Sequence, residues 1–275
     1  MSNPVFSSSP VFGERRRSAV PVAYGQAGGV AADAATLERM YGAPAATTRD
    51  TGRLTYDDVI VKTGGLLLLL VVVAAATWLT APQIWPIGML VGLVLGLVNS
   101  FKREPSPALI VAYTVAEGVF LGGISLAFQN MTLDSATGTA EPIVLQAILG
   151  TFATFAAALF LYKSGRVRVT PKFTRVLLIA LVGYAVFSLV NFGLSFFMAS
   201  DGFGPLRNGA LGIGVGLLAV GLAAMSLVLD FDSIERGVRQ GVPARFAWTA
   251  AFGLVVTLVW LYLEILRLLA MFNRD

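Results

Sequence analysis

The sequence contains no cysteine and no histidine among its 275 residues. Without cysteine, the chain has no disulfides, thiolate nucleophiles or cysteine-based metal sites. Without histidine, it lacks the commonest general base and the side chain that titrates near neutral pH. Zinc proteases of the His-Glu-x-x-His type and serine proteases with a histidine base are therefore excluded. We expect no enzymatic activity and no cofactor.

Charged side chains are also scarce. They make up 13% of the sequence, whereas hydrophobic residues make up 56% and soluble domains carry about 25% charged residues. So few charges leave too little polar surface for a water-facing globule. The net charge of +4 does not indicate a nucleic-acid partner, because the basic residues lie between apolar stretches. The expected environment is a lipid bilayer, and we predict the plasma (cytoplasmic) membrane.

Seven apolar stretches are long enough to cross about 30 Å of hydrocarbon. The sequence therefore predicts an all-α membrane protein whose seven transmembrane helices occupy residues 56–275. The sixth helix is expected to end at Asp230 or Asp232, followed by a charged loop over residues 233–243. The predicted spans are 60–80, 84–101, 107–128, 143–162, 176–198, 209–230 and 245–271.

The first 55 residues differ from the rest of the chain. They are rich in Ser, Pro, Gly, Ala and charge, and they contain no apolar segment of the signal-peptide kind. The basic triplet at residues 15–17 suits a solvated segment near anionic headgroups. We predict that residues 1–55 form a disordered cytoplasmic tail.

The basic residues of the loops predict the orientation. The loops after the second, fourth and sixth spans hold two, five and three Lys or Arg residues, the last number including Arg245 at the start of the seventh span, whereas those after the first and third hold none. The loop after the fifth span holds only Arg207. Basic loops stay on the cytoplasmic side, so the N-terminus is predicted inside and, after seven crossings, the C-terminus outside.

Glycines recur at helical spacing in two of the spans. Gly88, Gly92 and Gly96 share one face of the second span, and Gly212 and Gly216 share one face of the sixth. Small residues in such a pattern let membrane helices approach closely. We interpret both faces as helix-packing surfaces.

Four carboxylates within or near the spans are candidates for function: Glu117, Asp230, Asp232 and Glu264. Each charge in hydrocarbon costs about 2.5–3.5 kcal/mol on insertion scales, so such residues are retained for a reason. Structural explanations remain open for all of them. Asp230 and Asp232 could mark a helix end, and Glu264 could pair with Arg267, three residues later on the same face.

Together these acids could line one polar path across the bundle. Carboxylates are hard oxygen ligands suited to Ca²⁺, and buried carboxylates can also carry protons. In a chain without histidine, a pH response of the membrane part must come from such groups.

Three segments carry a family resemblance: Tyr113–Ser125 (YTVAEGVFLGGIS), Met225–Glu235 (MSLVLDFDSIE) and Trp260–Leu269 (WLYLEILRLL). With them, residues 55–272 resemble the transmembrane Bax-inhibitor-motif family, in particular its bacterial branch. The resemblance implies six helices around a central seventh. It also implies a pH-sensitive Ca²⁺ leak governed by one carboxylate on helix six and one on helix seven.

The family's helix-six acid fits Asp232 best, with Asp230 as second choice, and its helix-seven acid corresponds to Glu264. Asp232 and Glu264 are therefore the candidate ion ligands. Their numbers differ by 32, which is more than is usual in the family. Straight antiparallel helices would hold these two carboxylates roughly 20 Å apart in depth, so Glu117 stays open as an alternative partner of Glu264.

Three functions follow as hypotheses. The first is a cation leak, for Ca²⁺ in particular, that responds to carboxylate protonation. The second is a membrane adaptor or regulator that binds other membrane proteins, such as a membrane-bound protease. The third is a proton-coupled cation exchanger, since buried carboxylates serve both exchange and leak.

Overall fold

The computed structural model describes residues 52–132, 142–198 and 204–273. The prediction of a disordered tail at residues 1–55 lies outside these ranges except at its last four residues. Those four residues belong to the folded part, because residues 52–54 pair with the loop before the last helix and Thr55 caps α3.

The described residues form seven helices that are long and apolar enough to span a membrane. They contain no strand beyond one isolated β-bridge, and the predicted all-α fold class is confirmed. In chain order the elements are α3 (Tyr56–Thr80), the 3₁₀ turn η1 (Pro82–Ile84), α4 (Trp85–Phe101), α5 (Pro107–Met131), α6 (Ile143–Lys163), α7 (Pro171–Leu194), α8 (Gly209–Arg239), the 3₁₀ turn η2 (Ala244–Phe246) and α9 (Ala247–Phe272).

Local sequence signals set several helix starts. Thr55 caps α3 through a capping box, in which its hydroxyl accepts from the Asp58 amide while the Asp58 carboxylate accepts from the Thr55 amide. Thr170 caps α7 by accepting from the Phe173 amide. Pro107 begins α5 at a position where the missing amide hydrogen costs nothing.

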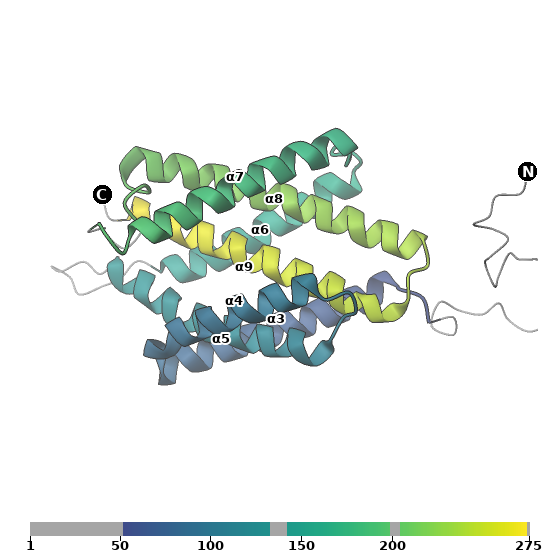
Figure 1. Cartoon of the computed structure of the whole chain (residues 1–275), viewed down its shortest axis with the longest axis horizontal. Helices are drawn as coiled ribbons and strands as arrows, with labels where there is room; N and C mark the ends of the chain where they lie inside the picture. The colour runs from purple at the N-terminus through teal and green to yellow at the C-terminus, as the bar shows by residue number, and fades with distance from the viewer. Residues whose placement is uncertain (1–51, 133–141, 199–203, 274–275) are drawn as a thin grey trace, which may run out of the picture. The chain divides into compact units, whose positions relative to one another are not determined.

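Helix α9 lies at the centre of the bundle, between two groups of three helices (Figure 1). α3, α4 and α5 pack together on one side, and α6, α7 and α8 on the other. In α9, 61% of the most apolar stretch is buried, against 11% in α4 and in α7. α9 is therefore the core of the bundle, whereas α4 and α7 lie at the periphery.

The predicted glycine faces pack as expected. A Cβ at Gly88 would lie 2.7 Å from the Phe120 amide nitrogen of α5 and 2.8 Å from the Ala116 carbonyl oxygen, so no side chain fits. In α8, a Cβ at Gly216 would lie 2.5 Å from the Leu268 side chain of α9. The first contact brings the backbones of α4 and α5 close together, and the second lets a side chain of α9 pack on the backbone of α8, where lipid provides no hydrophobic drive.

The predicted end of the sixth span is wrong. α8 continues to Arg239 and takes up most of the expected loop over residues 233–243. Its last two turns carry ion pairs one helical turn apart, Asp232 with Arg236 at 2.6 Å and Glu235 with Arg239. Such pairs support a solvent-facing helix, so the drop in hydropathy marks the membrane surface and not the helix end.

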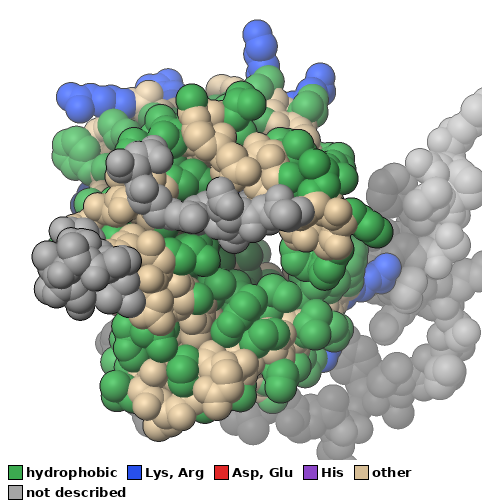
Figure 2. Space-filling model, turned by 90° about the vertical axis from the view of Figure 1, so that its left-hand side faces the viewer, with side chains coloured by type: hydrophobic (Ala, Val, Ile, Leu, Met, Phe, Trp, Pro, Cys, Tyr) green, Lys and Arg blue, Asp and Glu red, His purple; other side chains and the backbone are tan. Residues whose placement is uncertain are grey.

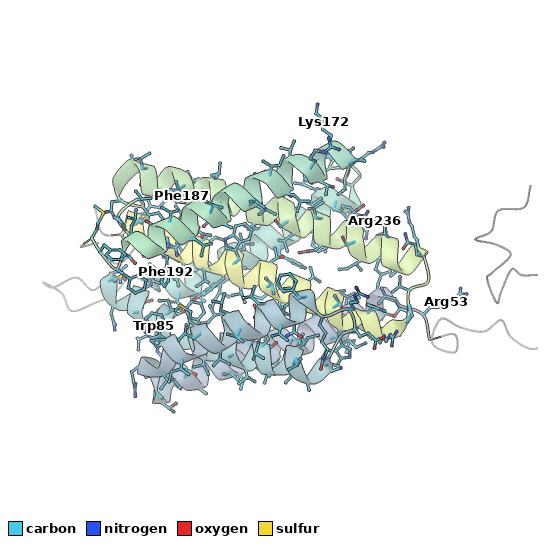
Figure 3. All side chains as sticks on the ribbon, viewed as in Figure 1. Arg53, Trp85, Lys172, Phe187, Phe192 and Arg236 are labelled. Carbon is cyan, nitrogen blue, oxygen red and sulfur yellow. The ribbon has the colours of Figure 1, made fainter. Side chains whose placement is uncertain are left out.

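The two ends of the bundle differ in charge. We call "basic end" the end formed by the start of α3 and the loops α4–α5, α6–α7 and α8–α9. Arg53, Lys172 and Arg236 lie there, while Trp85, Phe187 and Phe192 lie toward the opposite end (Figure 3). Seen from the opposite end, the described surface is mostly hydrophobic, and basic side chains project at its margins (Figure 2).

Candidate functional site

Glu264, in the last third of α9, holds the most buried carboxylate of the described chain, with 4% of its side chain exposed. Two arginines bind it. Arg207 Nη1 lies 3.3 Å from Oε2, and Arg267 Nη1 lies 3.1 Å from Oε1. The ion pair with Arg267, considered from sequence spacing, is thus formed, and Arg207 adds a second one.

Tyr184 of α7 completes the cluster. Its hydroxyl donates to Glu264 Oε1 and accepts from Arg207 Nη2. Its ring stacks on Trp260 of α9, with centroids 5.5 Å apart. The guanidinium of Arg207 lies 5.2 Å from the Tyr184 ring centre and 5.7 Å from that of Phe187, distances typical of cation–π contacts. α7 therefore reaches the central helix through this polar cluster.

Arg207 comes from the connection between α7 and α8 and turns into the bundle, with 3% of its side chain exposed. The turn is fixed on both sides. The Leu206 amide donates to Asn191 Oδ1 at 2.9 Å, and the Arg207 carbonyl packs directly on Gly212 of α8. Gly204, with φ of 88°, sits against the Asn191 side chain where no Cβ would fit.

The cluster of Glu264, Arg207, Arg267 and Tyr184 carries excess positive charge. Two guanidinium groups face one carboxylate, and the Nε atoms of both arginines are buried without a hydrogen-bond partner. A buried arginine is costly unless it is paired. The cluster is therefore held together chiefly by the charge of Glu264.

Asp230 of α8 lies at the same α8–α9 interface as Glu264, but nearer the basic end. Thr257 of α9 donates its hydroxyl to Asp230 Oδ2 at 2.7 Å, and Gly253 leaves space beside the other oxygen. Thr257 precedes Glu264 by seven residues, so the two carboxylates are about 10 Å apart in depth at 1.5 Å per residue. The structure brings Asp230 and Glu264 to one interface without direct contact.

Apolar side chains fill the interval between these two carboxylates. Ala223 and Leu227 of α8 and Leu261 of α9 are each 0% exposed. They belong to one packed cluster of buried residues. The described arrangement therefore offers no polar route from Glu264 to Asp230.

Glu117 does not join this interface. Its carboxylate lies over Gly92 of α4, where a Cβ would be 2.9 Å from Oε1, and it hydrogen-bonds Tyr113 one turn away on α5. Tyr113 in turn packs edge-on against Phe252 of α9 at 5.0 Å. Glu117 is therefore enclosed between α4 and α5, and its described contacts, with Gly92 and Tyr113, do not include Glu264, the partner that the sequence left open as an alternative.

Asp232, the first choice for the helix-six acid, also lies elsewhere. Residues two apart on a helix point about 200° apart, so Asp230 and Asp232 cannot both face α9. Asp232 pairs with Arg236 at the basic end and keeps 20% of its side chain exposed. Asp232 and Glu264 therefore do not form a common ion site, and the described residues hold no group of three acidic side chains arranged for a metal ion.

The chain, including these residues, matches a known protein family. The family model for Bax inhibitor 1-like proteins matches residues 3–274. The chain belongs to the Bax inhibitor 1-like family. The match begins near the first residue, so it includes the tail that the motif resemblance left out. No curated protein matches the chain.

Membership of this family, together with the seven apolar helices, makes the chain an integral multi-pass membrane protein. Three residues of the site were missed by reasoning from sequence: Arg207, Tyr184 and Thr257. Arg207 was counted as a loop cation, and Thr257 carried no signal. For Arg207 a signal existed, since it is the only Lys or Arg in the three predicted outer loops.

Proposed function

We propose that this protein is a pH-sensitive cation leak, with Ca²⁺ as the permeant ion, and that Glu264 controls it. The observation that carries the proposal is a fully enclosed carboxylate on the central helix, held by two arginines and a tyrosine. Ionisable groups at such positions in membrane helices mark ion or proton pathways. The second carboxylate of the route is Asp230, on the same interface.

The described arrangement corresponds to the closed state of this leak. Arg207 is paired with the Glu264 carboxylate, which a permeating cation would need as a ligand. Apolar side chains separate Glu264 from Asp230. Opening requires that Arg207 leaves Glu264 and that α8 and α9 separate between the two acids. Ca²⁺, which prefers carboxylate oxygens, then takes the place of the guanidinium.

Protonation of Glu264 acts on this site through charge. The ionised carboxylate offsets one of the two arginines, whereas the protonated form leaves both uncompensated. Two positive charges repel a divalent cation. Protonation also releases Arg207 from Glu264, but the released guanidinium stays in the path beside Arg267, and the carboxylate is lost as a ligand for the cation. We propose that this repulsion dominates, so that Ca²⁺ flux falls as Glu264 becomes protonated.

The proposal also covers the membrane in which the protein lies, its orientation there and its general role. We propose that the protein lies in a cytoplasmic membrane, as in the family's bacterial branch, with the N-terminus inside and the C-terminus outside. The concentration of basic residues at one end supports this orientation. The role proposed is transport and not catalysis.

Ca²⁺ flux into dye-loaded liposomes tests the proposal. Glu264→Gln and Asp230→Asn should each lower the flux about tenfold or more, because each removes a negative charge that a divalent cation would contact. Glu264→Gln should also lose the pH dependence. Asp232→Asn is the matched control: it neutralises a partly exposed acid of α8, two residues from Asp230 and paired with Arg236 at the basic end, and should leave the flux within about twofold.

Wild-type flux in both Glu264→Gln and Asp230→Asn would refute this route. The same liposomes, loaded with a pH dye, separate a leak from an exchanger. Proton movement in fixed proportion to Ca²⁺ would show that the protein is a proton-coupled exchanger and not a leak.

A further inference from the structure

At the basic end, residues 52–54 pair with the loop between α8 and α9. The Leu54 amide donates to the Val242 carbonyl at 2.7 Å, and the Ala244 amide donates to the Gly52 carbonyl at 2.8 Å. Arg53 and Pro243 lie opposite each other as an antiparallel bridge. We call residues 52–54 the strap.

The sequence of the loop fits this pairing. In an antiparallel pair, residues between two hydrogen-bonded positions face each other without exchanging bonds. Pro243 occupies such a position, where its missing amide hydrogen is not needed. Gly52 and Gly241, with φ of 62° and 66°, adopt backbone conformations that other residues rarely reach. Both partners are thus shaped for the contact.

Burial adds to the hydrogen bonds. Leu54 is 4% exposed and belongs to the apolar cluster that contains Phe231 of α8 and Ala247 of α9. Gly237 of α8 provides the space, since a Cβ there would lie 3.1 Å from the Leu54 side chain. The strap therefore joins the start of α3 to both helices that carry the proposed acids.

Other links join the α8–α9 hairpin to the α3–α5 group at this end, among them the apolar packing of Val59 of α3 in the cluster that contains Ala247. Arg245 pairs with Glu104 of the α4–α5 loop at 3.3 Å, and both side chains are more than half exposed. Lys62 lies 5.7 Å from the Trp248 ring centre. Exposed ion pairs of this kind contribute little. The strap supplies the backbone hydrogen bonds between the start of α3 and residues 242–244, and these bonds must break before the loop can move away from α3.

We propose that the strap is a latch on the α8–α9 hairpin, which must detach from residues 242–244 before α8 and α9 can separate. A force on the chain preceding residue 52 would act directly on this latch. The inference rests on the proposed leak for its effect on flux, but the latch itself can be measured without flux.

The absence of native cysteine allows a direct test. The double variant Arg53→Cys/Pro243→Cys places two thiols in a pair that lacks hydrogen bonds, with Cα atoms about 4.5 Å apart, close enough for a disulfide. Under oxidation, the cross-linked protein should conduct Ca²⁺ about fivefold less or lower, and reduction of the same sample should restore the flux. Each single-cysteine variant is the matched control and should not respond to the oxidant.

Complete cross-linking with unchanged flux would overturn the latch. If the wild-type protein conducts no Ca²⁺ at all, the proposed function fails and the latch is judged by amide hydrogen exchange. The Leu54 and Ala244 amides should exchange slowly in the wild-type protein, and Leu54→Ala should speed the exchange of both. Fast exchange of both amides in the wild-type protein would show that no latch exists.

Discussion

Replacement of Arg207 by methionine separates the stabilising role of this arginine from its proposed effect on flux. The guanidinium is buried, pairs with Glu264 at 3.3 Å and hydrogen-bonds Tyr184. Methionine keeps the apolar stem of the side chain while it removes the charge and the guanidinium that lies over the Tyr184 and Phe187 rings. Glu264 retains Arg267 at 3.1 Å, so the carboxylate is not left alone.

The expected loss of stability follows from those contacts. One buried hydrogen-bonded charge pair is removed and its carboxylate partner stays half satisfied, which costs about 2–3 kcal/mol. For a domain of this size, that loss lowers the unfolding temperature by about 4–12 °C. Glu264→Gln should cost at least as much, because it leaves two arginines without a counter-charge.

The expected change in flux has the opposite sign for these two variants. Arg207→Met removes one positive charge, which lowers the energy of a divalent cation about 6 Å away by about 5.5 kcal/mol at an effective dielectric constant of about 20. Other energy barriers along the ion path also limit the flux, so only part of this electrostatic gain increases the rate. We expect a rise in Ca²⁺ flux of about tenfold or more. Glu264→Gln should lower the flux although it destabilises the protein as well.

Thermal unfolding in nanodiscs and liposome flux, measured on the same preparations, check both quantities. Arg239→Met is the control, because Arg239 also pairs with a glutamate but keeps 75% of its side chain exposed; it should change stability by less than about 1 kcal/mol. The reasoning is refuted if Arg207→Met leaves the unfolding temperature unchanged, or if its flux falls together with that of Glu264→Gln.

Two further predictions concern packing and orientation. Gly88→Ala should destabilise the protein, because its Cβ would lie 2.7 Å from a backbone nitrogen of α5, whereas Gly64→Ala, with no atom within 4 Å, should be neutral in the same unfolding assay. Alkaline phosphatase is active only outside the cytoplasm; fused after Asp134 it should be active, and fused after Arg168 inactive. Stability loss in Gly64→Ala alone, or the reverse fusion pattern, would contradict these expectations.

Most of the fold could be predicted from run length and composition. Seven apolar stretches gave seven helices because the hydrocarbon thickness dictates how long each must be. The spacing of Gly88, Gly92 and Gly96 also predicted a packed face correctly, since residues that recur at every fourth position lie on one side of a helix. These features depend on short-range patterns, which the sequence carries directly.

The end of α8 was mistaken because hydropathy reports the membrane and not the helix. The pattern Asp232, Glu235, Arg236 and Arg239 contains two acid–base pairs at the spacing of one turn. That spacing favours a helix that continues into water. Consideration of charge periodicity beside hydropathy would have placed the helix end at Arg239.

The partners of the acids could not be predicted, because they depend on which way each helix faces. Glu117 lies at a depth that suits a shared path, yet its helix turns it toward Gly92 of α4. Thr257 of α9 donates a hydrogen bond to Asp230 of α8, although the two residues are 27 positions apart in the sequence. Helix rotation about its own axis is set by packing with neighbours, and no local pattern reports it.

The position of Arg207 decides how strongly the two ends of the bundle differ in charge. Counted as a loop cation, it weakens the charge asymmetry that predicts orientation. In the structure it is buried against Glu264, so it presents no charge to the surface. Apart from Arg207 and Arg267, which both pair with Glu264, the basic side chains in the described part of the chain lie at or near the basic end. The asymmetry is therefore sharper than the loop count suggests, and the opposite end has placed both of its cations where they can hold one carboxylate.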